Sequence, residues 1–169
     1  MSGRRSRARL YAVLALYQWQ LTGQQDPAEI LRHFSEDPAW VSELAESLVE
    51  DADVPASPGE ARESGYDRGL FKQLLLGVPA NLQGLDSRLQ AALDRPIAQV
   101  DPVERAILRV GAFELLHSPS VPYRVAINEA VDLAKLLGAE QGHRYVNGVL
   151  DRVARSTRRG ESGVNAVDG

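Results

Sequence analysis

The spacing of apolar residues is the feature of this sequence that most constrains its fold, because it is helical almost everywhere. In segment 10–21 the apolar side chains recur at intervals of three and four residues: Leu10, Val13, Leu14, Tyr17 and Leu21. Such spacing places them on one face of a helix. No segment shows the apolar–polar alternation of a strand. The pattern predicts an all-α bundle of about seven helices.

Two predicted helices begin with the same capping residues. In "DPVERAILRV" Asp101 can accept hydrogen bonds from the first backbone N–H groups, Pro102 suits the first helical position, and Glu104 stands third. The segment "DPAEILRHF", which starts at Asp26, repeats this order. Both starts are therefore predicted from local chemistry alone.

Two further segments set the predicted boundaries. Residues 51–65 are rich in acids, Pro, Gly and Ser, which indicates a loop that follows an amphipathic helix at 40–52. After Arg155 the chain has no apolar face. The prediction is one helical domain over 1–155, with an acidic loop around 51–65, and a disordered tail over 156–169.

Charge is distributed unevenly behind a net charge of -4. Residues 1–25 hold four arginines and no acid, whereas residues 26–67 hold 12 acids and two arginines. A basic arm on an acidic protein suggests local contact with a polyanion. The alternative, four solvated arginines on a frayed end, stays open. If the first helix starts early, its polar residues form one stripe: Arg4, Arg7, Tyr11 and Gln18.

The sequence offers no chemistry of an enzyme. There is no cysteine, and the three histidines lie on different segments without metal-ligand spacing. No Gly-rich phosphate loop or nucleophile elbow is present. We therefore expect no catalytic residues, no metal and no cofactor. No apolar run approaches the roughly 20 residues of a membrane span, so we expect an unprocessed cytoplasmic protein.

The stretch "GHRYVNGVLDRVAR" places several polar residues at the start of the last predicted helix. His143 and Asn147 share a side but have no acid or nucleophile beside them, so we interpret Asn147 as a buried hydrogen-bonding clamp. Arg144 and Tyr145 offer a cation for a phosphate and a ring on which a base can stack. A packing tyrosine beside a solvated arginine is the alternative.

Three segments resemble the NusB family of bacterial transcription antitermination factors: "RRSRARLYAVLALYQWQL", "VERAILRVGAFELL" and "VPYRVAINEAVDLAKLLGAEQGHRYVNGVLDRVA". They cover the first helix and nearly all of residues 101–154. The resemblance implies an all-α fold of two packed helical bundles, in agreement with the periodicity. It also implies a protein that makes and breaks no bond.

The function implied by the resemblance is that of an RNA-binding adaptor. Members of the family pair with ribosomal protein NusE and bind the boxA element of nascent RNA. The pair joins NusA, NusG and RNA polymerase, notably on ribosomal RNA operons. We therefore expect single-stranded boxA RNA and NusE as partners, and no cofactor.

The resemblance also implies which residues do this work. The positions that match the family's RNA contacts are Arg5, Arg7, Arg9, Arg144 and Tyr145. The positions toward NusE are Glu104 and Gln141. Gln141 carries no charge where the family often has an acid.

Two other functions are open to this sequence. NusB-like domains also serve as N-terminal RNA-binding modules of some ribosomal RNA methyltransferases, which carry a second, cofactor-binding domain for which this chain has no room. The protein could instead be a structural homodimer when free, because the wide apolar cover of two of its helices could serve self-association.

Overall fold

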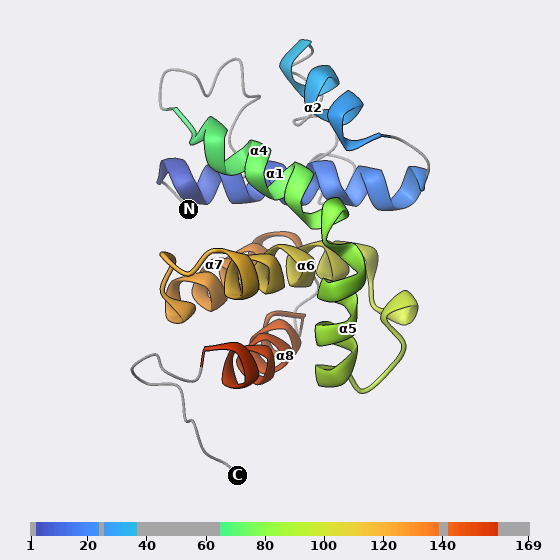
Figure 1. Cartoon of the computed structure of the whole chain (residues 1–169), viewed down its shortest axis with the longest axis vertical. Coiled ribbons are helices and arrows are strands. Elements are labelled where there is room, and N and C mark those ends of the chain that lie inside the picture. The colour runs from blue at the N-terminus through green and yellow to red at the C-terminus, as the bar shows by residue number, and fades with distance from the viewer. Residues whose placement is uncertain (1–2, 24–25, 37–64, 139–141, 159–169) are drawn as a thin grey trace. The chain divides into compact units, whose positions relative to one another are not determined.

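The computed structural model describes residues 3–23, 26–36, 65–138 and 142–158. These ranges contain seven α-helices, one short 3₁₀ helix and no strand, so the all-α prediction is confirmed (Figure 1). The chain divides into two compact units, Met1–Ala80 and Asn81–Gly169. The predicted helix at 40–52 lies outside the described residues, and so does the acidic loop except for Gly65.

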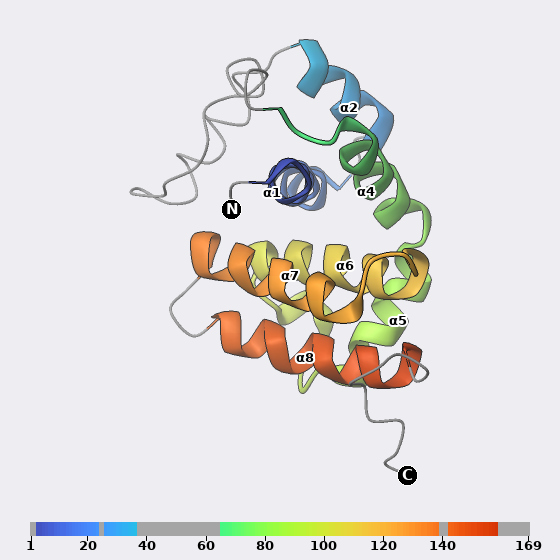
Figure 2. The same cartoon turned by 90° about the vertical axis from the view of Figure 1, so that its left-hand side faces the viewer.

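The first unit contains α1 (Arg4–Thr22), α2 (Pro27–Glu36) and α4 (Arg68–Ala80). Helix α4 lies along α1, and α2 packs against α4 (Figures 1 and 2). Gly23 ends α1 in a left-handed conformation at φ 67°, from which its N–H donates to the Trp19 carbonyl oxygen at 2.9 Å. A residue with a β carbon rarely adopts this conformation, so the glycine stops the helix there.

An aromatic cluster forms the core of the first unit. The ring of Tyr11 is fully buried and lies 5.7 Å from the Phe34 ring and 5.2 Å from the Tyr66 ring. Phe34 stacks on Phe71 at 4.3 Å. Burial raises the pKa of the Tyr11 hydroxyl. The predicted polar stripe is therefore wrong at Tyr11, because the ring is worth more in the core than its hydroxyl is in water.

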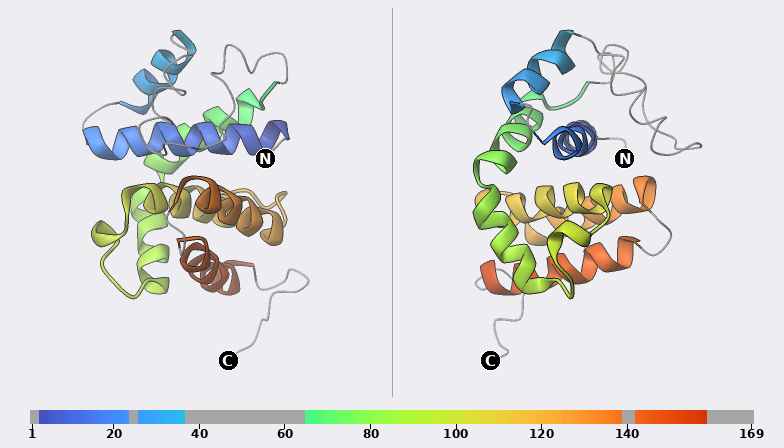
Figure 3. Two further views of the ribbon diagram at one scale, coloured as in Figure 1. Left: turned by 180° about the vertical axis from the view of Figure 1, so that it is seen from behind. Right: turned by 90° about the vertical axis from the view of Figure 1, so that its right-hand side faces the viewer.

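The second unit contains α5 (Leu82–Ala92), a 3₁₀ helix η1 (Ile97–Gln99), α6 (Pro102–His117), α7 (Tyr123–Leu137) and α8 (Gly142–Thr157). Helices α6, α7 and α8 pack on one another (Figure 2), and α5 crosses α6 and α8 (Figure 3). Helix α6 is buried almost throughout its length, which makes it the centre of this unit.

The predicted helix starts are confirmed. Asp101 Oδ1 accepts hydrogen bonds from the backbone nitrogens of Val103 at 3.0 Å and Glu104 at 3.2 Å. At the start of α2, Asp26 Oδ1 accepts from the Ala28 nitrogen at 3.0 Å. These side chains satisfy N–H groups that have no partner inside the helix.

A bidentate ion pair joins α5 to α6. Arg109 Nε donates to Asp86 Oδ1 at 3.0 Å, and Arg109 Nη2 donates to Asp86 Oδ2 at 2.8 Å. The two side chains are 10% and 24% exposed. A guanidinium that sits this deep needs its carboxylate, because an unpaired charge is costly in a poorly solvated place.

The last helix continues beyond its predicted end. It runs to Thr157, and Arg158 then bonds to four carbonyl oxygens near the turn between α6 and α7: Glu114, Leu115, Ser118 and Val121, at 2.8 to 3.1 Å. The helix therefore extends two residues past Arg155, and a long polar side chain, not an apolar face, fixes its end. The rest of the predicted tail, 159–169, lies outside the described residues.

The ion pair leads to a first prediction. Removing one partner of a buried pair costs about 3–5 kcal/mol, and partial exposure of Asp86 reduces this, so we expect Asp86→Ala to lower the free energy of unfolding by about 2–3 kcal/mol. The matched control is Asp151→Ala, which breaks the exposed Asp151–Arg155 pair and should cost about 0.5 kcal/mol or less. Urea denaturation measures both, and equal losses would contradict the assigned role.

Candidate nucleic-acid interface

The first turn of α8 presents Arg144 and Tyr145, the two residues predicted at this place. Arg144 is exposed, and Tyr145 is partly exposed. The Tyr145 hydroxyl donates a hydrogen bond to Asp94 Oδ1 at 3.1 Å. Asp94 follows α5, so this bond joins the start of the last helix to a loop 51 positions earlier in the chain.

The cation that covers the Tyr145 ring is Arg95. Its guanidinium carbon lies 4.8 Å from the ring centroid, within the range of a cation–π contact. Arg95 Nε also donates to Asp94 Oδ1 at 2.9 Å. We call Asp94, Arg95 and Tyr145 the Tyr145 cluster. It holds the ring in one orientation with a positive charge directly beside it.

The loop that carries Asp94 and Arg95 is held from both sides. The Gln90 side chain donates to the Arg95 carbonyl oxygen at 2.9 Å and accepts from the Ile97 nitrogen at 2.9 Å. Arg105 Nη1 bonds to the Ala98 carbonyl oxygen at 3.3 Å. Ordering the loop in advance reduces the entropy that a ligand must remove on binding.

Electrostatics of the Tyr145 cluster follow from these bonds. Hydrogen bonds from Arg95 and Tyr145 lower the pKa of the Asp94 carboxyl. Burial, followed by hydrogen bonding to Asp94, raises the pKa of the Tyr145 hydroxyl. At neutral pH the cluster therefore contains a carboxylate, a guanidinium and a neutral phenol.

Glu104, predicted to face NusE, lies in the first turn of α6, and its side chain reaches the start of α8. Its carboxylate oxygen Oε1 contacts Gly142, and a β carbon there would force the Glu104 carboxylate to move. Desolvation, followed by the charge of Asp101, raises the pKa of this carboxyl. A carboxylate at a helix N-terminus is favourable. Gln141, the other residue predicted to face NusE, lies outside the described residues.

The three arginines predicted to contact RNA at the start of the chain differ in their exposure to solvent. Arg5 is exposed, as an RNA contact requires, whereas Arg7 is 8% and Arg9 2% exposed. Arg7 Nε donates to the Gly65 carbonyl oxygen at 2.6 Å. Arg7 and Arg9 are therefore less accessible than Arg5, since both belong to a continuous buried run of α1, and their contact with RNA stays a prediction.

His143 and Asn147 lie near the start of α8. Asn147 is exposed, so the interpretation as a buried clamp is wrong, because the side chain points away from the apolar face of α8. Among the described residues no group of three or more His, Cys, Asp or Glu side chains could hold a metal ion. No helix in the described ranges is long and apolar enough to cross a membrane.

Sequence reasoning missed Asp94 and Arg95. Both lie between α5 and η1, where helical spacing assigns no face. The only signal was local: the pair precedes Pro96, which marks a break but says nothing of a distant tyrosine. The candidate interface thus contains Arg144 and Tyr145, with Glu104 beside them. It also contains Asp94 and Arg95, which the helical spacing did not indicate.

Comparisons with known proteins agree with this arrangement. The model of the NusB family matches residues 6–155. The chain is 50% identical to the transcription antitermination protein NusB of Alkalilimnicola ehrlichii, over 89% of this chain and 81% of that protein. It is 49% identical to the same protein of Nitrosococcus oceani, over 95% and 92%.

Solved structures show the same fold. T. maritima NusB aligns with a TM-score of 0.65 at 27% identity, covering 91% of this chain and 92% of that one. A complex of the antitermination factors NusB and NusE with dsRNA aligns with a TM-score of 0.64 at 24% identity, covering 92% and 99%, which is a likeness of fold. With the helices, the Tyr145 cluster and these matches in place, the chain belongs to the NusB family of transcription antitermination proteins.

Proposed function

We propose that this chain is a non-catalytic adaptor that binds the boxA element of nascent single-stranded RNA together with ribosomal protein NusE. The pair joins NusA, NusG and RNA polymerase, notably on ribosomal RNA operons, and allows transcription to continue past terminators. The protein works in the cytoplasm, where this RNA is made. The observation that carries the proposal is the fixed, partly exposed Tyr145 ring with Arg95 over it and Arg144 exposed in the same turn.

The chemistry of the Tyr145 cluster suits single-stranded RNA. An aromatic ring offers a stacking surface to any base, and guanidinium groups bind phosphates. Because Asp94 and Arg95 hold the ring, a base meets it already in place. Arg5, exposed at the start of α1, adds a further cation, whereas Arg7 and Arg9 reach RNA only if their buried side chains are released.

The position and charge of Glu104 support NusE as a binding partner. Glu104 is partly exposed in the first turn of α6, beside the start of α8, and its charge influences Arg95 and Tyr145 electrostatically. A basic partner that pairs with this carboxylate would therefore act next to the residues proposed for RNA. Gln141, which precedes α8, is proposed to face the same partner.

The described residues add no support for the homodimer alternative. It relied on widely apolar helices, and the apolar side chains of α1 and α6 are buried within this single chain. The large apolar side chains that stay exposed in the described part are Leu21 and Val125. Isolated exposed apolar residues are normal on a monomer.

One prediction of the proposed function concerns affinity and its dependence on salt. The protein with NusE should bind boxA RNA more tightly than the protein alone, and more tightly than a scrambled RNA. Each phosphate that is neutralised should contribute about -0.7 to the slope of log affinity against log salt. Titration of labelled RNA at several salt concentrations measures this. A flat salt profile, or equal affinity for the scrambled RNA, would refute the proposal.

A second prediction concerns the Tyr145 ring. Tyr145→Ala should weaken RNA binding by about 1–3 kcal/mol, the usual worth of a base stacked on an aromatic ring. The matched variant Tyr145→Phe keeps the ring and loses only the hydrogen bond to Asp94, so it should retain most of the affinity. Thermal melting of both variants serves as the control. If the alanine variant binds RNA as the wild type does, Tyr145 is a packing residue.

A third prediction concerns Glu104. Glu104→Lys should weaken the complex with NusE, because it reverses the charge at the proposed contact. Glu29→Lys is the matched control, since Glu29 also lies in the first turn of a helix that begins with Asp-Pro, and it is exposed on the first unit. Binding of NusE to both variants can be measured by calorimetry. Equal affinities would show that Glu104 has no part in the contact.

A further inference from the structure

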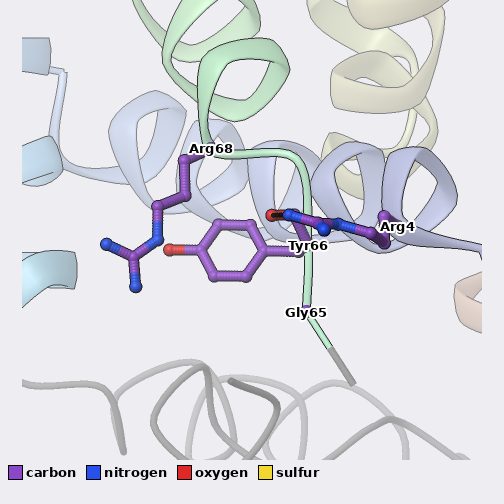
Figure 4. A pocket seen from close by; sticks show the side chains of 4 residues that line it. All are labelled: Arg4, Gly65, Tyr66 and Arg68. Carbon is purple, nitrogen blue, oxygen red and sulfur yellow. Dashed lines mark hydrogen bonds between the residues drawn. The ribbon is translucent and has the colours of Figure 1, made fainter. Parts of the chain in front are cut away.

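A polar pocket of about 180 Å³ opens on the first unit, beside the start of α1. It is lined by Arg4, Gly65, Tyr66 and Arg68 (Figure 4). Its volume is below the roughly 300–1,000 Å³ of sites that enclose a whole small molecule. The space therefore suits one group of a larger ligand.

Two guanidinium groups border this pocket. The Arg68 guanidinium carbon lies 5.7 Å from the Tyr66 ring centroid, and in Figure 4 the ring stands between the side chains of Arg68 and Arg4. Both arginines are exposed. The neighbouring acid, Asp67, does not line the pocket, and its Oδ1 accepts the hydrogen bond that caps α4, from the Leu70 nitrogen at 2.9 Å.

The walls of the pocket are fixed by the fold. Gly65 adopts a left-handed φ of 73°, and a β carbon there would lie 3.2 Å from Arg4 Nε, so glycine allows the guanidinium to approach the backbone. Arg4 Nη2 also lies 3.4 Å from the Tyr66 carbonyl oxygen. The Tyr66 ring packs edge-on against Tyr11 and Phe71 of the aromatic core.

The arginines at the start of α1 reduce the stability of that helix. The first turn of α1 contains arginines and no acid, and its N-cap, Gly3, makes no side-chain hydrogen bond. A helix N-terminus is the positive end of the helix dipole, so cations there reduce its stability. An anion bound in the pocket would reduce this repulsion and offset part of the charge of the two guanidinium groups.

We propose that Arg4 and Arg68 bind a backbone phosphate of single-stranded RNA in this pocket, with Tyr66 as its wall. The proposal rests on the proposed function, because the ligand is the RNA that the chain binds there. Guanidinium groups bind phosphate oxygens through paired hydrogen bonds, and a phosphodiester is one group of a longer ligand. The site adds two arginines to the proposed RNA contacts.

Arg68→Gln and Arg4→Gln test this site in the complex with NusE and a boxA-containing oligonucleotide. Each substitution should weaken RNA binding about tenfold, the usual worth of a charged hydrogen bond. Each should also reduce the salt slope by about 0.7, the share of one phosphate. The matched control is Arg32→Gln, which removes an exposed arginine of α2 that does not line the pocket and should leave both values unchanged. Thermal melting verifies that all variants are folded.

The outcomes separate this site from the proposed function. If Arg68→Gln behaves as Arg32→Gln does while Tyr145→Ala weakens RNA binding, the pocket is wrong and the RNA-binding role stands. If the control Arg32→Gln weakens RNA binding as much as Arg68→Gln and Arg4→Gln do, only net charge matters, and the pocket is wrong as well. If the wild-type complex binds no RNA, both proposals are wrong. Saturable binding of inorganic phosphate that Arg68→Gln abolishes, without any change in RNA affinity, would assign the pocket to a free anion instead.

Discussion

Guanidinium groups bonded to backbone carbonyl oxygens hold several non-helical segments of this protein in place. Arg7 bonds to Gly65, Arg105 to the 3₁₀ helix, and Arg158 to the turn after α6. A guanidinium has five donors in a rigid plane, so one side chain can satisfy several carbonyl oxygens that lie outside helices. The loops that carry functional residues depend on these bonds for their shape.

These arginine bonds explain why only part of the fold and of the candidate site could be predicted from the sequence. Helix starts were predictable because their interactions are local: Asp101 caps nitrogens two and three positions ahead. The partner of Arg7 is 58 positions away, and that of Asp94 is 51 positions away. Helical spacing contains no information about such contacts. It therefore assigned Arg7 and Tyr11 to a polar stripe that the fold buries, and it gave Arg95 no role at all.

The residues proposed to contact RNA and those proposed to contact NusE influence one another electrostatically. Tyr145 is held by two residues that follow α5, and Glu104 contacts the first residue of α8. Since Glu104, Arg95 and Tyr145 influence one another's ionisation, a change of charge at one position is felt at the others. In such an arrangement, binding of a basic protein at Glu104 removes a negative charge from beside a surface meant for phosphates. On the proposed function, this neutralisation would raise the affinity for RNA.

The bonds of Arg158 have a practical consequence for shortened versions of the protein. Periodicity suggests cutting after Arg155, since no apolar residue beyond it completes the helical face. That cut would remove the guanidinium that binds four carbonyl oxygens and leave them to water. A chain trimmed for crystallisation or spectroscopy should therefore retain Arg158, or the connection between α6 and α7 will fray although every apolar contact has been preserved.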